Sequence, residues 1–154
     1  MGNIKFTNNS VKVKGAIKDA CIAALYAAGG ELQSEVVKNQ KRYNDTGQTA
    51  GSWTYRVDEG NMTATVGSTM ENAIWEEFGT GQYALNGDGR KGGWFIPGDK
   101  LSAKAKSKMQ KIVINGKEYY LTYGKKPRRH LFRAMNAKKA QIRKAFEEKM
   151  KGLR

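Results

Sequence analysis

The segment IVINGKEYYLTY, residues 112–123, decides the fold class of this chain. Two runs rich in β-branched and aromatic residues flank Asn115-Gly116, a dipeptide typical of the two-residue type I′ turn. The segment therefore predicts an antiparallel hairpin. A further strand is predicted shortly before it, over Trp94-Phe95-Ile96.

A second hairpin is predicted over residues 52–66, as two alternating runs around a turn at 58–61. Trp53, Tyr55 and Val57 share one face of the first run, which is the pattern of a half-buried strand. Two hairpins in one chain indicate antiparallel rather than parallel pairing.

Helices are predicted at both ends, over residues 11–40 with Ser10 as N-cap and over residues 129–153. Their apolar residues recur in steps of three and four: Ile17, Cys21, Ala24, Leu25, Ala28, Leu32 and Val36 in the first, and Leu131, Met135, Ile142, Phe146, Met150 and Leu153 in the last. Gly29-Gly30 predicts a kink or a very tight crossing in the first helix.

A short helix is predicted over residues 71–78, with Ala73, Ile74 and Phe78 on one face. A glycine-dense loop follows over residues 79–93. Hairpins between terminal helices predict an α+β fold with an antiparallel sheet, built as a single domain over residues 1–154.

The charge is divided unequally along the chain. The 28 Lys and Arg exceed the 14 Asp and Glu. Residues 1–78 hold 8 basic and 9 acidic side chains, whereas residues 79–154 hold 20 and 5. Such a basic half indicates a polyanion, an acidic partner surface or a solvated face, and charge alone leaves these open.

No membrane partner and no secretion are expected. The chain has no apolar run near the roughly 18 residues that a membrane span needs. Its start, MGNIKFTNNS, lacks the apolar stretch of a signal peptide.

No enzymatic constellation is recognised. Residues 87–92 match GxGxxG but lack the preceding strand and following helix of a dinucleotide site. Glu76 and Glu77 are adjacent on a helix and point in different directions, so they predict a polar helix face rather than a catalytic pair. An alternative role for Glu77 is to anchor an arginine or the neighbouring loop amides.

Cys21 and His130 are the single cysteine and histidine of the chain. One of each excludes a disulfide framework within the chain and a Cys- or His-rich metal site. Cys21 belongs to an apolar stripe, and no third group is placed to orient a Cys-His pair. We therefore expect neither catalysis nor a cofactor nor a metal.

Several segments together resemble the gene-product-ten-like tail-component family of tailed phages. They are Asp45-Thr46-Gly47 with Ser52-Trp53, the block NAIWEEFGTG at residues 72–81, the loop at 82–94, and Gly124 to Pro127 followed by Leu131 to Ala134. The resemblance extends over about residues 10–150. It departs from the family pattern at Ala50 or Gly51, where leucine is usual, and at Asn72, where tyrosine is common. The Lys-rich stretch 98–111, weakly helical by pattern, looks like an insertion.

The resemblance implies a virion structural protein of the head–tail connector region, assembled in the bacterial host cytoplasm. It implies a neck or tail-completion ring, often of six subunits, similar in fold to tail-tube and tail-terminator proteins. The ring would contact a neck or head-closure ring and a tail-tube or tail-terminator protein. Alternatives are a head-closure or tail-terminator ring, a basic DNA-binding accessory protein, and a toxin-like or nuclease domain.

Two sets of contact residues follow from this resemblance and from the charge. The inter-subunit or inter-ring set is Glu77, Phe78, Gly79, Thr80, Gly81, Tyr83, Asp88, Arg90 and Trp94. The set for an acidic partner, or for DNA in the lumen, is Lys100, Lys104, Lys106, Lys108, Lys125, Lys126, Arg128 and Arg129. Gly79 and Gly81 are expected at positive φ, and Thr80 is expected to satisfy loop amides.

Overall fold

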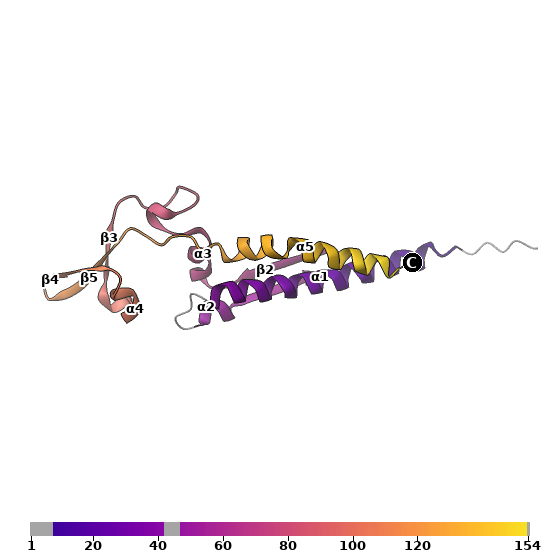
Figure 1. The fold of residues 1–154 in the computed structure, drawn as a ribbon, viewed down its shortest axis with the longest axis horizontal. Helices are drawn as coiled ribbons and strands as arrows, with labels where there is room; N and C mark the ends of the chain where they lie inside the picture. Colours follow the sequence, from indigo (N-terminus) through magenta and orange to yellow (C-terminus); the bar gives the residue numbers. More distant parts are fainter. Residues whose placement is uncertain (1–7, 42–46, 154) are drawn as a thin grey trace, which may run out of the picture. The chain divides into compact units, whose positions relative to one another are not determined.

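A computed structural model describes residues 8–41 and 47–153 of the chain. It contains two compact units, which we call the helical unit (residues 1–70 and 130–154) and the hairpin unit (residues 71–129). Helices at both ends and antiparallel hairpins confirm the predicted α+β class (Figure 1). The single-domain organisation stays a prediction. Asp45-Thr46, part of the resemblance, lies outside the described residues.

The helical unit is built on two packed helices, α1 (Ser10–Lys41) and α5 (His130–Lys151). Lys138 on α5 pairs with Glu31 on α1 at 3.0 Å, and this carboxylate raises the pKa of Lys138. Both terminal helices are therefore confirmed, and α1 continues unbroken through Gly29-Gly30.

Two details of these helices differ from the prediction. Ser10 is the first helical residue rather than the cap, and its N–H donates to Oδ1 of Asn8 at 2.9 Å. Met135 is 51% exposed, whereas its neighbour Ala134 is fully buried. The smaller side chain lies inside because a methyl group lets helices approach closely, which the periodicity of large apolar residues does not reveal.

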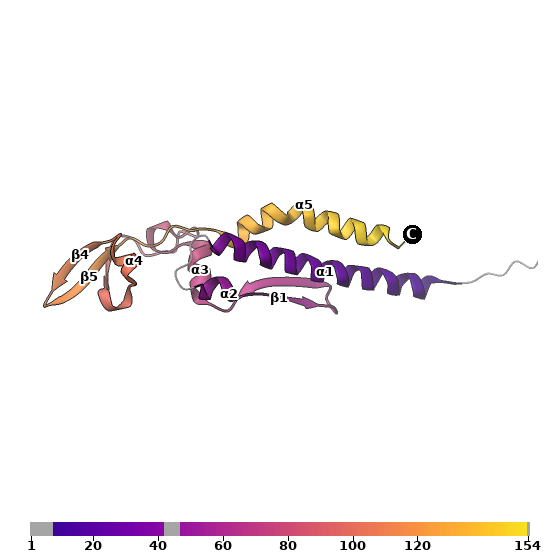
Figure 2. The same cartoon turned by 60° about the horizontal axis from the view of Figure 1, so that its bottom comes forward.

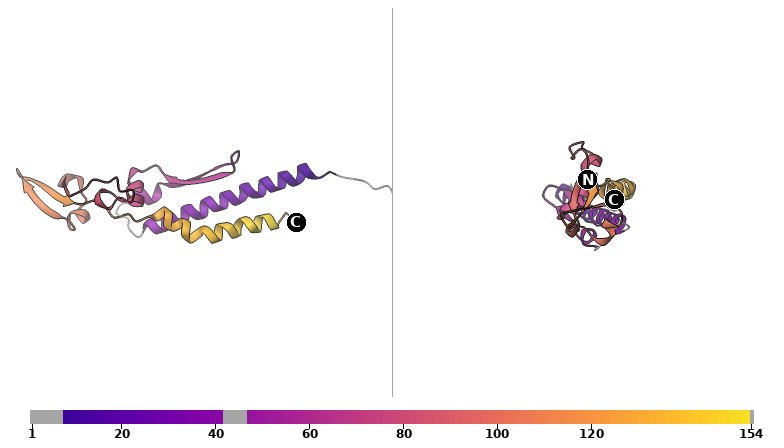
Figure 3. Two further views of the ribbon diagram at one scale, coloured as in Figure 1. Left: turned by 90° about the horizontal axis from the view of Figure 1, so that it is seen from above. Right: turned by 90° about the vertical axis from the view of Figure 1, so that its left-hand side faces the viewer.

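The first hairpin pairs β1 (Trp53–Asp58) with β2 (Thr63–Ser68) after the single turn α2 (Gln48–Gly51). Figures 2 and 3 show α1 lying between this hairpin and α5. Trp53 is buried, its indole N–H donates to Gln40 and its carbonyl accepts from Gln33 at 2.7 Å. The predicted hairpin and its inward face are confirmed.

Gly29 of α1 is the point of closest approach to this hairpin. A Cβ on Gly29 would lie 2.4 Å from Cδ2 of Tyr55. The glycine therefore makes room for the tyrosine ring. Of the two predictions for Gly29-Gly30, the tight crossing is confirmed.

Gly29→Ala and Gly15→Ala are expected to change stability in opposite directions. Alanine is the better helix former by about 1 kcal/mol. At Gly15 nothing lies within 4 Å, so we expect that full gain there. At Gly29 the displaced Tyr55 ring should outweigh it and leave a net loss of about 1–2 kcal/mol. Chemical denaturation of both variants measures this difference, and a gain at Gly29 would contradict the close approach.

The hairpin unit begins with α3 (Glu71–Phe78) and contains a three-stranded antiparallel sheet. The sheet has the order β3-β5-β4, from β3 (Trp94–Pro97), β4 (Gln110–Ile114) and β5 (Lys117–Thr122). Asn115 and Gly116 have φ of 49° and 75°, which confirms the type I′ turn.

Short helical turns connect the other elements of the hairpin unit: η1 (Gly81–Tyr83), η2 (Gly98–Lys100) and α4 (Ala103–Lys106). The Lys-rich stretch 98–111 is thus helical only in part, because β4 already begins at Gln110. Pairing of Gln110 and Lys111 with Leu121 and Tyr120 of β5 explains the earlier start.

The face of α3 is the reverse of the predicted one. Ile74 is 57% exposed and Phe78 46% exposed, whereas Glu76 and Glu77 are buried. Ala73 is buried as predicted. The cations Lys125 and Arg128 account for this orientation, because both pair with the Glu76 carboxylate.

Candidate functional site

All predicted contact residues belong to the hairpin unit. They fall into four structural groups: the end of α3 with the turn that follows it, the loop up to Trp94, the chain segment 123–129, and the Lys-rich stretch around α4. The first three groups are brought together, although segment 123–129 was predicted as part of a separate contact.

The turn after α3 is built on two glycines. Gly79 and Gly81 have φ of 75° and 59°, as predicted. The Gly79 N–H donates to the Trp75 carbonyl at 2.9 Å, so this glycine ends the helix as a left-handed cap. A Cβ on Gly79 would lie 2.8 Å from the carbonyl oxygens of Lys125 and Tyr83.

Three hydrogen bonds join this turn to segment 123–129. The Thr80 N–H donates to the Lys125 carbonyl at 2.9 Å, and the Lys125 N–H donates to Oγ1 of Thr80, also at 2.9 Å. The Gln82 N–H donates to the Tyr123 carbonyl at 3.1 Å. The role predicted for Thr80 is confirmed, since its hydroxyl satisfies a loop amide.

Glu76 is the centre of charge in this group. Its carboxylate pairs with the Lys125 ammonium and accepts from Nη1 of Arg128 at 2.8 and 3.1 Å. Its carbonyl accepts the Arg128 N–H at 2.7 Å. A buried carboxylate needs such partners, which explains why Glu76 lies inside. The polar helix face is therefore wrong for Glu76, which is anchored by an arginine. Glu77 is buried beside it, and its own anchoring role stays a prediction.

Two aromatic rings in the group each have a cationic side chain over their face. Arg90 lies over Trp94 at 5.4 Å, and Lys126 lies over Tyr83 at 5.6 Å. Both distances suit cation–π contacts. The glycine-dense loop is folded back on the turn as well, because a Cβ on Gly89 would lie 2.0 Å from the Gly81 carbonyl oxygen.

The Lys-rich stretch forms a different surface. Figure 1 shows α4 beside the β4–β5 hairpin and away from α3. Ser102 caps α4 by accepting the Ala105 N–H at 3.3 Å. Lys100, Lys104 and Lys108 are exposed, and no ion pair is formed by them among the described residues.

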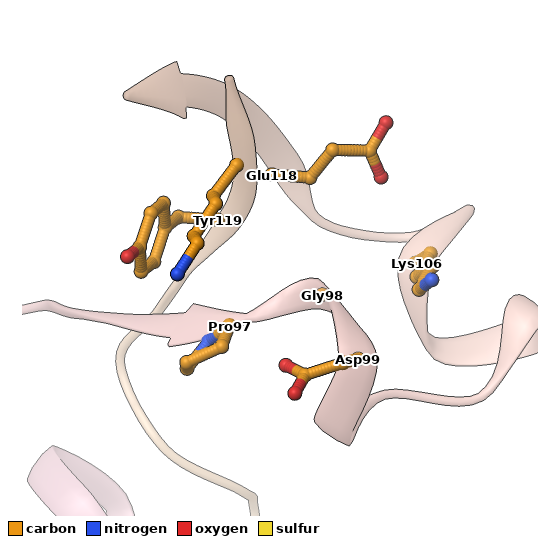
Figure 4. Close-up of a pocket in the computed structure, with 7 residues that line it drawn as sticks. Pro97, Gly98, Asp99, Lys106, Glu118 and Tyr119 are labelled. Carbon is orange, nitrogen blue, oxygen red and sulfur yellow. The ribbon is translucent and has the colours of Figure 1, made fainter. Parts of the chain in front are cut away.

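A polar cleft of about 490 Å³ adjoins this stretch (Figure 4). Lys106 and Lys117 line it together with Asp99, Glu118 and Tyr119. Charges of both signs meet there.

The Glu118 carboxylate beside this cleft is already paired with Lys111. This hydrogen bond, and then the Tyr120 hydroxyl at 3.2 Å, hold the pKa of Glu118 below its ordinary value. Glu118 is therefore a weak candidate for holding a further cation.

The single cysteine and histidine belong to the helical unit. Cys21 is half-buried on α1, and His130 is buried at the start of α5. Within residues 8–41 and 47–153 no group of three or more His, Cys, Asp or Glu side chains is arranged to hold a metal ion. In that same part of the chain, no helix is long and apolar enough to cross a bilayer.

Comparisons with known proteins give one match. Residues 4–79 match the model of the family described as "Bacteriophage HK97-gp10, putative tail-component". The match ends at Gly79, so it includes α1, the first hairpin and α3. Neither the curated proteins nor the solved structures give a match to this chain. Over residues 4–79, just under half of the chain, the sequence is similar to the HK97-gp10-like family of phage tail components.

Proposed function

We propose that the chain is a ring subunit of the phage head–tail junction, where it joins the neck to the tail tube without catalysing a reaction. The match of residues 4–79 to a tail-component family supports a structural role in the virion and contacts with other tail or neck proteins. We propose three points beyond this match: that the chain forms a ring, that the ring is a hexamer, and that it lies at the head–tail junction.

The observation that carries the proposal is the number of large apolar side chains exposed on the hairpin unit. They are Ile74, Trp75, Phe78, Leu85, Phe95, Val113, Ile114 and Tyr123. Single exposed apolar residues are ordinary, but an accumulation on one small unit is typical of protein interaction surfaces. A ring subunit needs two different complementary faces, because head-to-tail contacts are heterologous.

The basic residues are assigned to an acidic protein partner first and to DNA in the lumen second. Glu76 already offsets part of the charge of Lys125 and Arg128. Less of their charge is therefore left for the phosphates of DNA, which supports this order. Lys104 and Lys108 are the better candidates for a partner because they are exposed. A DNA-binding accessory protein would instead lose affinity steeply as salt is raised.

The proposal is tested in the phage that encodes the chain. Deletion of the gene should give filled capsids and complete tails that fail to join, and a labelled copy should appear at the junction by electron microscopy. Infectious particles that lack the chain would overturn the proposal.

Charge reversal at Lys104 and Lys108 then separates the two partners. Loss of assembly in the absence of DNA indicates the protein partner, whereas intact particles that lose their genome indicate DNA.

A further inference from the structure

Two exposed apolar surfaces of this chain carry charges of opposite sign at their margins. The first is a groove at the far ends of α1 and α5, which we call the tip groove. It measures about 740 Å³ and is lined by Val13, Ala16 and Ile17 of α1 and by Met150 and Leu153 beside them, with Asn9 and Lys12 at its margin. This volume is in the range of clefts that enclose a drug-sized ligand, or a few large side chains.

The tip groove has a basic surrounding. Lys12, Lys14 and Lys18 lie on the same stretch of α1. On α5, Glu147 and Glu148 are paired with Arg143 and Lys144. Lys149 and Lys151 follow them. A second copy of this same groove would bring like charges together, so the groove is unsuited to a symmetric contact with itself.

The second surface is the outer face of α3. Glu71, Ile74, Trp75 and Phe78 are all exposed. They stand at positions i, i+3, i+4 and i+7, so they share one face of the helix. This is the spacing of anchors with which an amphipathic helix enters an apolar groove.

The two surfaces are complementary. The face of α3 supplies three large apolar side chains and one exposed carboxylate, Glu71. The tip groove supplies an apolar floor and the Lys12 ammonium at its edge. We propose that α3 of one copy docks into the tip groove of the next copy, with Trp75 as the central anchor. This proposal rests on the proposed function, because a ring requires a contact between neighbouring copies. It deepens that function by naming the lateral contact.

The contact is head-to-tail, since each copy uses a different surface on each side. An open assembly therefore keeps one unfilled surface at each of its two ends until a ring closes. Burial of an indole at the centre of an interface is typical of a binding hot spot, whose loss weakens binding by about 30-fold or more. A single substitution on either surface should thus prevent self-association.

Two variants of the full chain test this contact. Trp75→Lys blocks the face of α3, and Ile17→Lys blocks the tip groove. Analytical ultracentrifugation over a concentration series should show self-association of the parent chain and a loss of at least about 30-fold in affinity for each variant. Both residues are exposed, so circular dichroism should show both variants folded.

Mixing the two variants gives the decisive result. The intact α3 of Ile17→Lys should enter the intact groove of Trp75→Lys, which yields a 1:1 dimer that cannot grow. Val11→Lys and Met62→Lys are the matched controls, since both residues are exposed outside the two surfaces and outside the exposed apolar set of the hairpin unit. The controls should associate as the parent does.

Three results would overturn the contact: a parent chain that stays monomeric, a variant that associates like the parent, or a mixture that gives no dimer. Its failure is distinguishable from that of the proposed function. If the chain lies at the junction while Trp75→Lys assembles normally, only the contact is wrong. If the contact forms in solution while particles lacking the chain infect normally, only the proposed function is wrong.

Discussion

Gly81→Ala should unfold much of the hairpin unit. Alanine at positive φ costs about 1–2 kcal/mol. Its Cβ would also lie 2.4 Å from the Tyr123 carbonyl oxygen and 2.7 Å from the Trp94 ring. Neither neighbour is a flexible side-chain end that can move aside, so the crowding should bring the total loss to about 3 kcal/mol or more. Gly124→Ala should act alike, because its Cβ would lie 2.1 Å from the Thr80 carbonyl oxygen.

Hydrogen exchange is the suitable measurement, because it reports the two units separately. The amides of Thr80 and Lys125 should lose protection, whereas those in α1 should keep theirs. Gly87→Ala is the matched control. Gly87 has a φ of 73° in the same loop, yet nothing lies within 4 Å of its Cβ position. The control isolates the backbone strain, and an equal loss in both variants would show that crowding contributes nothing.

The contact predicted at the turn should be tested with variants that keep both glycines. If Gly79 and Gly81 are required for the fold of the unit, as the crowding at both predicts, substituting them would prevent assembly whether or not the turn touches a partner. Asp88 and Arg90 are exposed members of the same predicted set. Their substitution tests the contact without removing the turn.

Local patterns in the sequence predict most of the secondary structure. The Asn115-Gly116 dipeptide and the alternation at Trp53, Tyr55 and Val57 are sufficient because hairpins join residues that are neighbours along the chain. Positive φ at Gly79 and Gly81 was predictable for a similar reason, since it depends on the end of one short helix.

The arrangement around Glu76 is not predictable from such patterns. Its partners Lys125 and Arg128 follow 49 and 52 residues later in the chain. Periodicity assigns the outer face of a helix to its charged residues, so α3 was given the wrong orientation. The ion pairs of Glu76 place a charged residue on the inner face instead. They can be recognised only once the path of segment 123–129 is known.

Glu76→Gln is expected to destabilise the hairpin unit by about 1–3 kcal/mol. Removal of one partner of a buried ion pair costs up to about 3–5 kcal/mol. The smaller value applies here because the Lys125 and Arg128 side chains are 36% and 33% exposed, so water can solvate them once the carboxylate is lost. Glutamine keeps the shape of the side chain. The change in stability therefore reports the charge.

Glu71→Gln is the matched control, because Glu71 is an exposed carboxylate on the same helix. It should change the stability by less than about 0.5 kcal/mol. Urea denaturation of both variants, followed by the hydrogen exchange of Lys125, measures the difference. Equal effects would mean that the ion pairs contribute nothing and that α3 is held by its other contacts.

The same variant also tests which cations are available to DNA. If Glu76 occupies Lys125 and Arg128 in the folded chain, Glu76→Gln removes the one negative charge that they share and frees both cations for phosphate contacts. The affinity for DNA, if there is any, should then fall more steeply as salt is raised. The slope of log affinity against log salt concentration should increase in magnitude by up to about 1.8. An unchanged slope, with the chain folded, would show that these two cations face no polyanion, and would leave Lys100, Lys104 and Lys108 as the basic residues that a partner reaches.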